Sequence, residues 1–352
     1  MSYEIGWAAM NLEMAPRVPR VEFDAERHWP LVKAVTGIEV SHESPRELQH
    51  RASLEFVRAW HYDTALGAAI HMNELAAKST SMGHAVYAAG GVDYNDCIEC
   101  PFESPEEVLA FDPWEFYGER DAAELIRRFE EDYHGRCRDM PDLVNMSGVY
   151  ITCVSGLIAM FGWEMLLTAA GLDPEGLGEV TNRYAKWIAQ YYHALADTDV
   201  PVIYSHDDIV WTSGAVFRPD WYRRYVFPNL KMLWEPLLEA GKKILFISDG
   251  DYTEFVDDIV ACGAYGFFME PLTDMAYVAR KYGKTHVIIG NADTRALLSG
   301  DRGRIRAEVQ RCMDIGRDCP GWFMGVTNMI PPNTPVESAL YYNEVYEELC
   351  RR

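Results

Sequence analysis

Short apolar runs alternate with amphipathic runs through the second half of the chain. Three apolar runs, KILFI, GFFM and HVIIG, fall between positions 243 and 290. Runs of this length that are apolar throughout are typical of parallel strands buried on both faces. Between them, apolar residues recur at helical spacing, and Gly263 and Gly283 suit the ends of two helices. The pattern therefore predicts strand, helix, strand, helix, strand.

The same alternation extends over most of the chain and predicts eight strands. Their centres are expected around Val21, Trp60, Val144, Ile203, Leu245, Phe268, Ile288 and Phe323. Eight strands that alternate with helices predict an α/β fold of the (β/α)8 TIM barrel type. An open doubly wound sheet is less favoured because the sequence has no G-x-G-x-x-G and no P-loop. We expect one barrel domain over residues 1–352.

Two segments depart from this alternation. Residues 1–16 are rich in methionine and are expected to form an N-terminal extension that lies on the domain. Residues 78–118 follow the second predicted strand and include a Gly90-Gly91 pair, which favours a hairpin or lid-like insertion. Insertions on the ligand-binding face often act as lids. His84 and Tyr87 would then face the ligand.

Composition narrows the class of partner. Hydrophobic residues make up 49% of the chain, enough for a large core, and the formal net charge is -22. So acidic a protein is expected to bind neither nucleic acid nor an anionic membrane. The N-terminus lacks the layout of a signal peptide, so we expect a cytoplasmic protein. Cys97 and Cys100 form a lone C-x-x-C, and a zinc ribbon needs a second pair.

Polar side chains follow the predicted strands, and the carboxyl ends of barrel strands are where such folds bind ligands. His206 is a candidate general acid or metal ligand, with a satisfied structural histidine as the alternative. For Asp207 and Asp249 the alternative is helix capping. Glu270 is expected at the barrel mouth, where burial would raise its pKa. The further candidates after strands are His61, Asp63, Asn291 and Asn328.

Six motifs in the second half carry a family resemblance. They read SHDD, PDWYRRYVFP, KILFISDGD, GFFMEP, IIGNADTRALL and NMIPPNTPVESAL. From about Asp142 to the C-terminus the chain resembles the uroporphyrinogen decarboxylase superfamily. The resemblance implies a (β/α)8 barrel and one of two activities, decarboxylation or cobalamin-dependent methyl transfer.

The resemblance favours the methyltransferase branch. True decarboxylases present M-R-Q-A-G-R after the first strand and G-H-G near the last, whereas this chain reads VPRVEFDAERHW and GVTNMIPP. Asp63 nevertheless stands where that enzyme keeps its essential aspartate. Coenzyme M methyltransferases bind zinc through H-x-C after the fifth strand and a cysteine after the eighth. Here the matching positions read Ile247-Ser248-Asp249 and Thr327-Asn328, so a thiol substrate is not expected.

The resemblance thus implies the substrate-side methyltransferase of a corrinoid system. It would move a methyl group from a small methoxylated or methylamine-type compound to the cobalt of a corrinoid protein docked over the barrel mouth. The residues expected to assist catalysis are His206, Asp207, Asp249, Glu270 and His61. The residues expected to bind substrate are Asp63, His84, Tyr87, Trp211, Asn291 and Asn328.

Other interpretations stay open at this point. Zinc held by His206, Asp249, Glu270 and His84 is an alternative source of assistance to the leaving group. A decarboxylase like uroporphyrinogen decarboxylase and a non-catalytic corrinoid- or tetrapyrrole-binding protein are the alternative functions. A homodimer is also left open.

Overall fold

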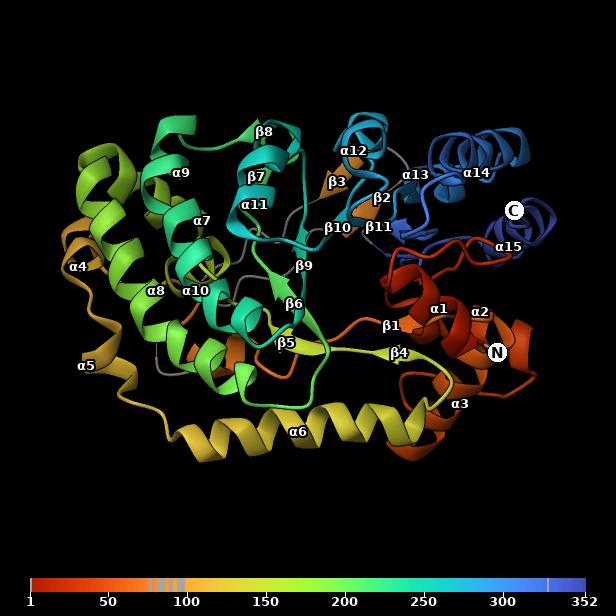
Figure 1. Ribbon diagram of the computed structural model, residues 1–352, viewed down its shortest axis with the longest axis horizontal. Coiled ribbons are helices and arrows are strands. Elements are labelled where there is room, and N and C mark those ends of the chain that lie inside the picture. The colour runs from red at the N-terminus through yellow and green to blue at the C-terminus, as the bar shows by residue number, and fades with distance from the viewer. Residues whose placement is uncertain (1, 76–77, 81–85, 89–90, 94–98, 328) are drawn as a thin grey trace.

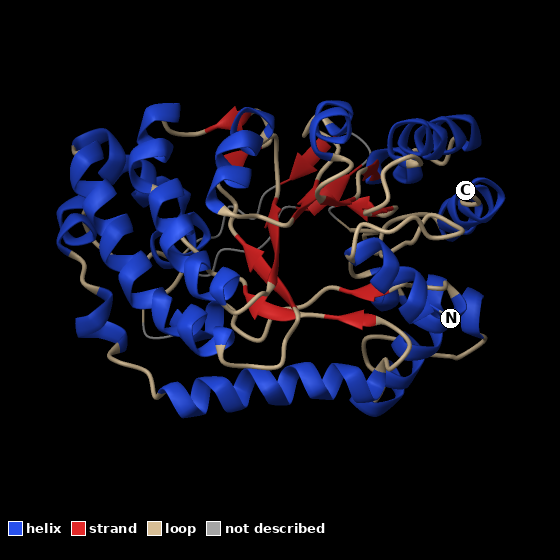
Figure 2. Ribbon diagram, viewed as in Figure 1, coloured by secondary structure: helices blue, strands red, loops and turns tan. Residues whose placement is uncertain are grey.

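The structure is a computed structural model, and the residues it describes are 2–75, 78–80, 86–88, 91–93, 99–327 and 329–352 (Figure 1). Strands lie at the centre and helices surround them (Figure 2). Buried apolar residues of both layers form one large core cluster.

Six strands form a continuous parallel sheet in the order β13-β11-β10-β9-β6-β5. Every residue in these strands is buried except Lys243, as expected for strands covered on both faces. Their bounds are β5 Ser147–Val149, β6 Val202–His206, β9 Lys243–Ser248, β10 Gly266–Met269, β11 Val287–Ile289 and β13 Trp322–Phe323.

Backbone hydrogen bonds join the two ends of this sheet through two further short segments. Each strand position around the barrel is called a stave. Arg20 bridges Met324 in parallel on one side, and its carbonyl accepts the Asp63 amide at 3.0 Å on the other. Val144 N in turn donates to Asp63 O at 3.1 Å. Here β1 (Thr64–Ala65) pairs in parallel with β4 (Val144–Asn145), which leads into β5. The ring of eight staves confirms the predicted (β/α)8 barrel.

The second predicted strand is misplaced. The structure has a helix there, α3 (Arg46–Ala59), with Trp60 as its C-cap, and the stave begins only at β1. Ala52, Phe56 and Trp60 are buried and four residues apart, which is helical spacing. The Phe56 and Trp60 rings pack at 4.7 Å between centroids. An aromatic-rich sequence typical of a strand is therefore the buried face of a helix.

The helices form an outer layer around the staves (Figure 2). Three of these helices are long: α6 precedes β4, and α7 and α8 follow β5 and pack on each other. The helices from α4 on are α4 Pro105–Ala110, α5 Pro113–Tyr117, α6 Ala122–Asp139, α7 Val154–Leu172, α8 Pro174–Ala196, α9 Pro219–Tyr225, α10 Phe227–Glu239, α11 Val256–Cys262, α12 Met275–Tyr282, α13 Thr294–Leu298, α14 Arg302–Gly316 and α15 Val336–Leu349.

One helix in the described part of the chain, α7, has the length and apolar composition of a membrane span. However, 61% of its most apolar window is buried inside the protein. Its regular geometry is also interrupted at Gly162, where φ is 69°. In this structure α7 packs as a core helix between α4 and α8.

Both departures from the barrel pattern have the predicted form. The N-terminal extension is α1 (Ser2–Met10), which packs on β1 and β4 and is followed by α2 (Trp29–Thr36). The insertion after the second stave contains an antiparallel hairpin of β2 (Val86–Ala88) and β3 (Gly91–Asp93). Strand β2 lies beside α13, which follows the seventh stave (Figure 1). The insertion therefore reaches from one side of the barrel to the other.

Candidate active site

Carboxylates link the loops that follow three consecutive staves. Asp208, just after β6, accepts the Asp249 amide at 2.9 Å through Oδ1. Glu270, just after β10, accepts the Gly250 amide at 2.6 Å through Oε2. Each bond crosses from one loop to its neighbour, so these bonds fix the spacing of the loops at the mouth. Charge-assisted hydrogen bonds to amides are stronger than neutral ones.

His206 is the histidine at this mouth and the last residue of β6. Its side chain is buried, with 4% exposed, and Nδ1 lies 2.8 Å from the Tyr150 carbonyl, to which it donates. Its Nε2 lies 3.3 Å from Asp208 Oδ1. Burial by itself lowers the pKa of His206, but the charge and hydrogen bond of Asp208 outweigh it and raise the pKa above its ordinary value. The position of Asp208 thus favours the protonated form of the imidazole.

Asp207, predicted to be catalytic, does not point into the mouth but toward the outer helices. It is fully buried, and its Oδ1 accepts the Ser155 amide at 2.7 Å in the first turn of α7. Burial raises the pKa of Asp207 to about 7, against the Ser155 hydrogen bond, which lowers it. Successive side chains of a strand point to opposite faces, so Asp207 faces the helices while His206 and Asp208 share the inner face. Asp207 is not the N-cap residue of a helix, since Cys153 is the N-cap of α7, but its carboxyl group accepts an amide of the first turn of α7 from a distant part of the chain.

Asp208 is therefore the residue that the sequence reasoning missed. It lay within the SHDD motif, two residues from His206, and the period of two along a strand was the signal that could have selected it. Two aromatic residues of the mouth were also missed. The Tyr150 ring stacks on His206 at 3.8 Å between centroids, and the His71 ring stacks on Tyr150 at 5.4 Å.

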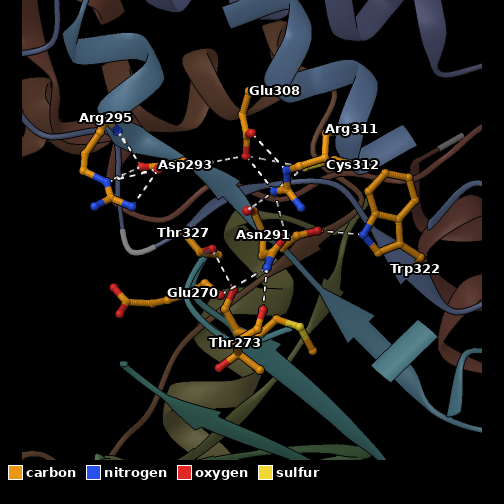
Figure 3. Close-up of polar contacts among 12 residues, drawn as sticks. Glu270, Thr273, Asn291, Asp293, Arg295, Glu308, Arg311, Cys312, Trp322 and Thr327 are labelled. Carbon is orange, nitrogen blue, oxygen red and sulfur yellow. Dashed lines mark hydrogen bonds and ion pairs between the residues drawn. The ribbon is translucent and has the colours of Figure 1, made fainter. Parts of the chain in front are cut away.

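Asn291, predicted to bind substrate, is a structural residue. It is fully buried, and its Nδ2 donates to the carbonyls of Glu270 and Thr273, each at 3.1 Å. Its Oδ1 accepts from Arg311 at 3.0 Å, so both ends of the amide are used (Figure 3). Asn291 therefore supports the loop that carries Glu270. Nearby, Asp293 caps α13 by accepting the Arg295 amide.

His61 and Asp63 lie at the opposite end of the barrel, and their predicted roles at the mouth are wrong. The His61 side chain is 62% exposed and lies 3.4 Å from Glu347. Asp63 precedes β1 and is buried, where it receives two hydrogen bonds from Arg17, each 2.7 Å long. Both residues were assigned to the end of a strand, but the chain there leaves α3 and enters β1. They consequently sit before a stave.

Trp211 lies beside the loop after β9. It ends β7 (Val210–Trp211), which pairs with β8 (Gly214–Ala215), and its carbonyl accepts the Asp251 amide at 3.3 Å. Its ring meets that of Trp163 edge to face, 5.0 Å between centroids. A role for Trp211 in substrate binding remains a prediction.

The side chains of three other predicted site residues are not described. His84 and Asn328 fall outside the described residues, and Tyr87 is described only through the backbone of β2.

The predicted zinc ligands do not assemble among the described residues. Within that part of the chain, the one group of three potential ligands with mutually close atoms is Glu130, His134 and Asp199, on the outer surface. His206, Asp249 and Glu270 form no such group, and His84 is not described. Zinc at the mouth stays a prediction.

Residues 136–349, which include every residue of the mouth except His71, match the family described as Uroporphyrinogen decarboxylase (URO-D). The chain belongs to the uroporphyrinogen decarboxylase family. Family membership agrees with the resemblance seen in the motifs and with the barrel.

Proteins named uroporphyrinogen decarboxylase are distant relatives of the chain. One from Thermus thermophilus is 29% identical over 163 residues, which is 46% of each chain. That of Carboxydothermus hydrogenoformans is 24% identical over 210 residues, covering 59% of this chain and 58% of the relative. The chain thus spans about half the length of the curated relatives that it matches.

A solved structure shares the fold over the whole chain. The "methyltransferase from Methanosarcina mazei" superposes with a TM-score of 0.65 and covers 99% of this chain and 98% of its own. Its sequence identity is 15%. The likeness supports the barrel fold of this member of the uroporphyrinogen decarboxylase family.

Proposed function

We propose that this protein is the substrate-side methyltransferase of a corrinoid system. It would transfer a methyl group from a methoxylated or methylamine-type compound to the cobalt of a corrinoid carried by a partner protein. The observation that carries the proposal is the pair formed by the buried His206 and the partly exposed Asp208, 3.3 Å apart at the barrel mouth.

The pair supplies what ether cleavage needs. When a methyl group leaves an ether oxygen, the C–O bond breaks and its electron pair stays on oxygen. A bound corrinoid would supply, from reduced cobalt, the electron pair for the new bond to the methyl carbon. The oxygen is a poor leaving group unless it is protonated. Asp208 raises the pKa of His206, and the leaving oxygen would have to take the place of Asp208 as the acceptor of the Nε2 proton. The carboxylate of Asp208, 3.3 Å from Nε2, would stabilise the protonated form of the imidazole before the transfer.

The donor set at the mouth fits an oxygen or nitrogen leaving atom. No cysteine stands within three residues after β9 or β14 (Val326–Thr327). Thr327 instead donates its hydroxyl to the Met269 carbonyl at 2.7 Å. Thiol activation by zinc depends on thiolate and imidazole ligands. The residues here therefore fit acid assistance better than activation of a thiol.

Decarboxylation is the second candidate because the curated relatives carry that name. A substrate with many carboxylates would need free cations after the first stave. Arg20 is fully buried and pairs with Glu22 at 2.8 Å, and Arg17 is committed to Asp63. Neither guanidinium is therefore available to a polyanion, and Arg27, the next cation along the chain, already lies 3.5 Å from Asp24. We therefore place decarboxylation second.

The test is methyl transfer to cob(I)alamin, followed by its absorption spectrum with a panel of methoxyarenes and methylamines. We expect a shift to methylcobalamin with at least one donor. His206→Gln should lower kcat by about 10²- to 10⁴-fold, the usual contribution of a general acid. His61→Ala is the matched control, because this exposed histidine lies at the other end of the barrel and should leave kcat unchanged.

The alternatives predict other results. Carbon dioxide released from uroporphyrinogen would support the decarboxylase. Tight corrinoid binding without a spectral change, with every donor tested, would support a non-catalytic binding protein. Either outcome contradicts methyl transfer.

A further inference from the structure

Proton transfer from His206 requires that its imidazole be held in one orientation. The torsion between Cβ and the ring has broad, roughly two-fold minima in histidine, so the side chain alone does not fix the ring. A half-turn about this bond exchanges the positions of Nδ1 and Cδ2, and those of Nε2 and Cε1. Contacts from neighbouring residues must therefore select the orientation in which Nε2 faces the mouth.

The backbone carbonyl of Tyr150 selects which nitrogen can release a proton. His206 Nδ1 lies 2.8 Å from this carbonyl. Because a carbonyl can only accept a hydrogen bond, Nδ1 must carry a hydrogen atom. Ser155 Oγ is a more distant neighbour of the same nitrogen, at 3.4 Å. A neutral imidazole keeps a hydrogen atom on one nitrogen only, so the proton that His206 can release is the one on Nε2.

The side chain of Tyr150 holds the plane of the imidazole. The two rings are stacked with their centroids 3.8 Å apart and an interplanar angle of 10°. The Tyr204 ring is also nearly parallel to His206 but lies at 6.3 Å, so Tyr150 makes the closer contact. The stack covers a face of the imidazole and leaves the edge that carries Nε2 uncovered, where Asp208 Oδ1 lies at 3.3 Å. Tyr150 therefore restrains the ring without blocking the nitrogen that would react.

Tyr150 is itself fixed by the neighbouring stave. Its amide donates to Ile70 O at 2.8 Å, and the His71 ring stacks on it at 5.4 Å between centroids. Burial and the charge of Asp208 raise the pKa of Tyr150 well above its ordinary value, so the phenol stays protonated. Tyr150 therefore has the properties of a rigid support for His206 and not those of a second acid.

We propose that Tyr150 is a positioning residue for methyl transfer, whose carbonyl and ring together hold His206 with Nε2 toward the leaving oxygen. The inference rests on the proposed function and adds a residue to it. In the transfer, the leaving oxygen replaces Asp208 as the acceptor of the Nε2 proton. The N–H bond breaks, its electron pair stays on Nε2, and the proton bonds to the leaving oxygen. His206 is then neutral, with its remaining proton on Nδ1 bound to the Tyr150 carbonyl.

Nitrogen NMR of the protein without substrate tests the orientation of the ring. Spectra are recorded at a pH above the titration of His206, whose signals are assigned by their loss in His206→Gln. The unmodified protein should show one tautomer, protonated at Nδ1. Tyr150→Leu removes the ring but keeps the carbonyl, so its nitrogen signals should move toward those of two exchanging tautomers. Tyr150→Phe keeps the ring and should restore the single tautomer.

Two further variants complete the series. Tyr150→Met, whose flexible side chain fills irregular space, replaces Tyr150→Leu if the latter does not fold. Tyr3→Leu is the matched control, because it removes a tyrosine ring that stacks on Trp7 at 6.1 Å within α1. It should leave the His206 signals unchanged.

Turnover gives an independent measurement. With a donor that reacts, Tyr150→Leu should lower kcat by about tenfold to a hundredfold, the scale for a reacting group that is no longer held in place, and should leave KM nearly unchanged. Tyr150→Phe should restore kcat to within about twofold, because the phenol takes no part in proton transfer.

The possible results separate this inference from the proposed function. Methyl transfer with the same kcat and the same tautomer in Tyr150→Leu as in the unmodified protein overturns the inference and leaves the proposed function standing. A raised KM with unchanged kcat would also overturn it, since Tyr150 would then bind substrate. Exchanging tautomers in Tyr150→Leu, without methyl transfer from any donor to the unmodified protein, would support the hold on His206 and refute the proposed function.

Discussion

Asp208→Asn isolates the charge that keeps His206 protonated. Asparagine retains an oxygen for the Asp249 amide but removes the negative charge 3.3 Å from His206 Nε2. Two unit charges at this distance attract by about 5 kcal/mol at an effective dielectric constant of about 20. That attraction is comparable to the several kcal/mol that burial costs an ion. Without it, only the hydrogen bond to the Tyr150 carbonyl and the charge of Asp207 oppose burial, so the pKa of His206 should fall.

The assay is the pH dependence of kcat for methyl transfer between pH 5 and pH 9. The acid form of His206 is the active one, so kcat should be constant at low pH and fall as pH rises through the raised pKa. In Asp208→Asn the fall should begin at lower pH, with a loss of about tenfold or more at pH 7.5, since each pKa unit changes the protonated fraction tenfold. Asp251→Asn is the control, because Asp251 binds the Thr253 amide at 3.0 Å in the neighbouring loop. Identical pH profiles for Asp208→Asn and the unmodified protein would refute the acid role of His206.

Two further predictions concern stability, measured by urea unfolding. Burial raises the pKa of Asp207 to about 7, so the folded state keeps a proton there that the unfolded state releases near pH 4. The free energy of unfolding should therefore fall as pH rises from 4 to 7. Asp207→Asn should reduce this dependence on pH, and an unchanged dependence would contradict the assignment. Asn291→Ala removes the donors to the Glu270 and Thr273 carbonyls and leaves these buried acceptors unsatisfied. The free energy of unfolding should fall by about 1–3 kcal/mol. A change below about 0.5 kcal/mol would exclude the structural role.

The fold was predictable wherever staves are continuous. Strands β9, β10 and β11 are short apolar runs that end in polar residues, and periodicity alone located them. The second stave was not predictable in the same way, because it consists of β1 and the single bridge at Ile70 with irregular residues between. A stave so short has no period to detect, and the aromatic residues of α3 offered a stronger but misleading signal.

The candidate site was predictable to the level of a loop but not of a side chain. The SHDD motif correctly marked the mouth, yet Asp207 and Asp208 differ only in which face of β6 they occupy. His71 was not among the predicted site residues because its stave was unrecognised, and Asn291 was assigned to substrate because its partner Arg311 lies 20 residues away on α14. Such pairings depend on tertiary contacts that local patterns do not encode.

Charge placement at the two ends of the barrel distinguishes the chemistry of this member from that of a polyanion-binding enzyme. Arg17 pairs with Asp63 before the second stave, and Arg20 pairs with Glu22, which also accepts the Val326 amide, so both guanidinium groups are already bound by carboxyl groups of the protein. At the mouth, the described carboxylates of Asp208 and Glu270 accept backbone amides. A substrate with several carboxylates would meet these like charges at short range, where low dielectric strengthens repulsion. Under the proposed function, a neutral ether would meet none of this repulsion, and cleavage of its C–O bond would place negative charge on an oxygen that His206 would protonate. The mouth thus favours one proton transfer to a leaving atom over the binding of many anions.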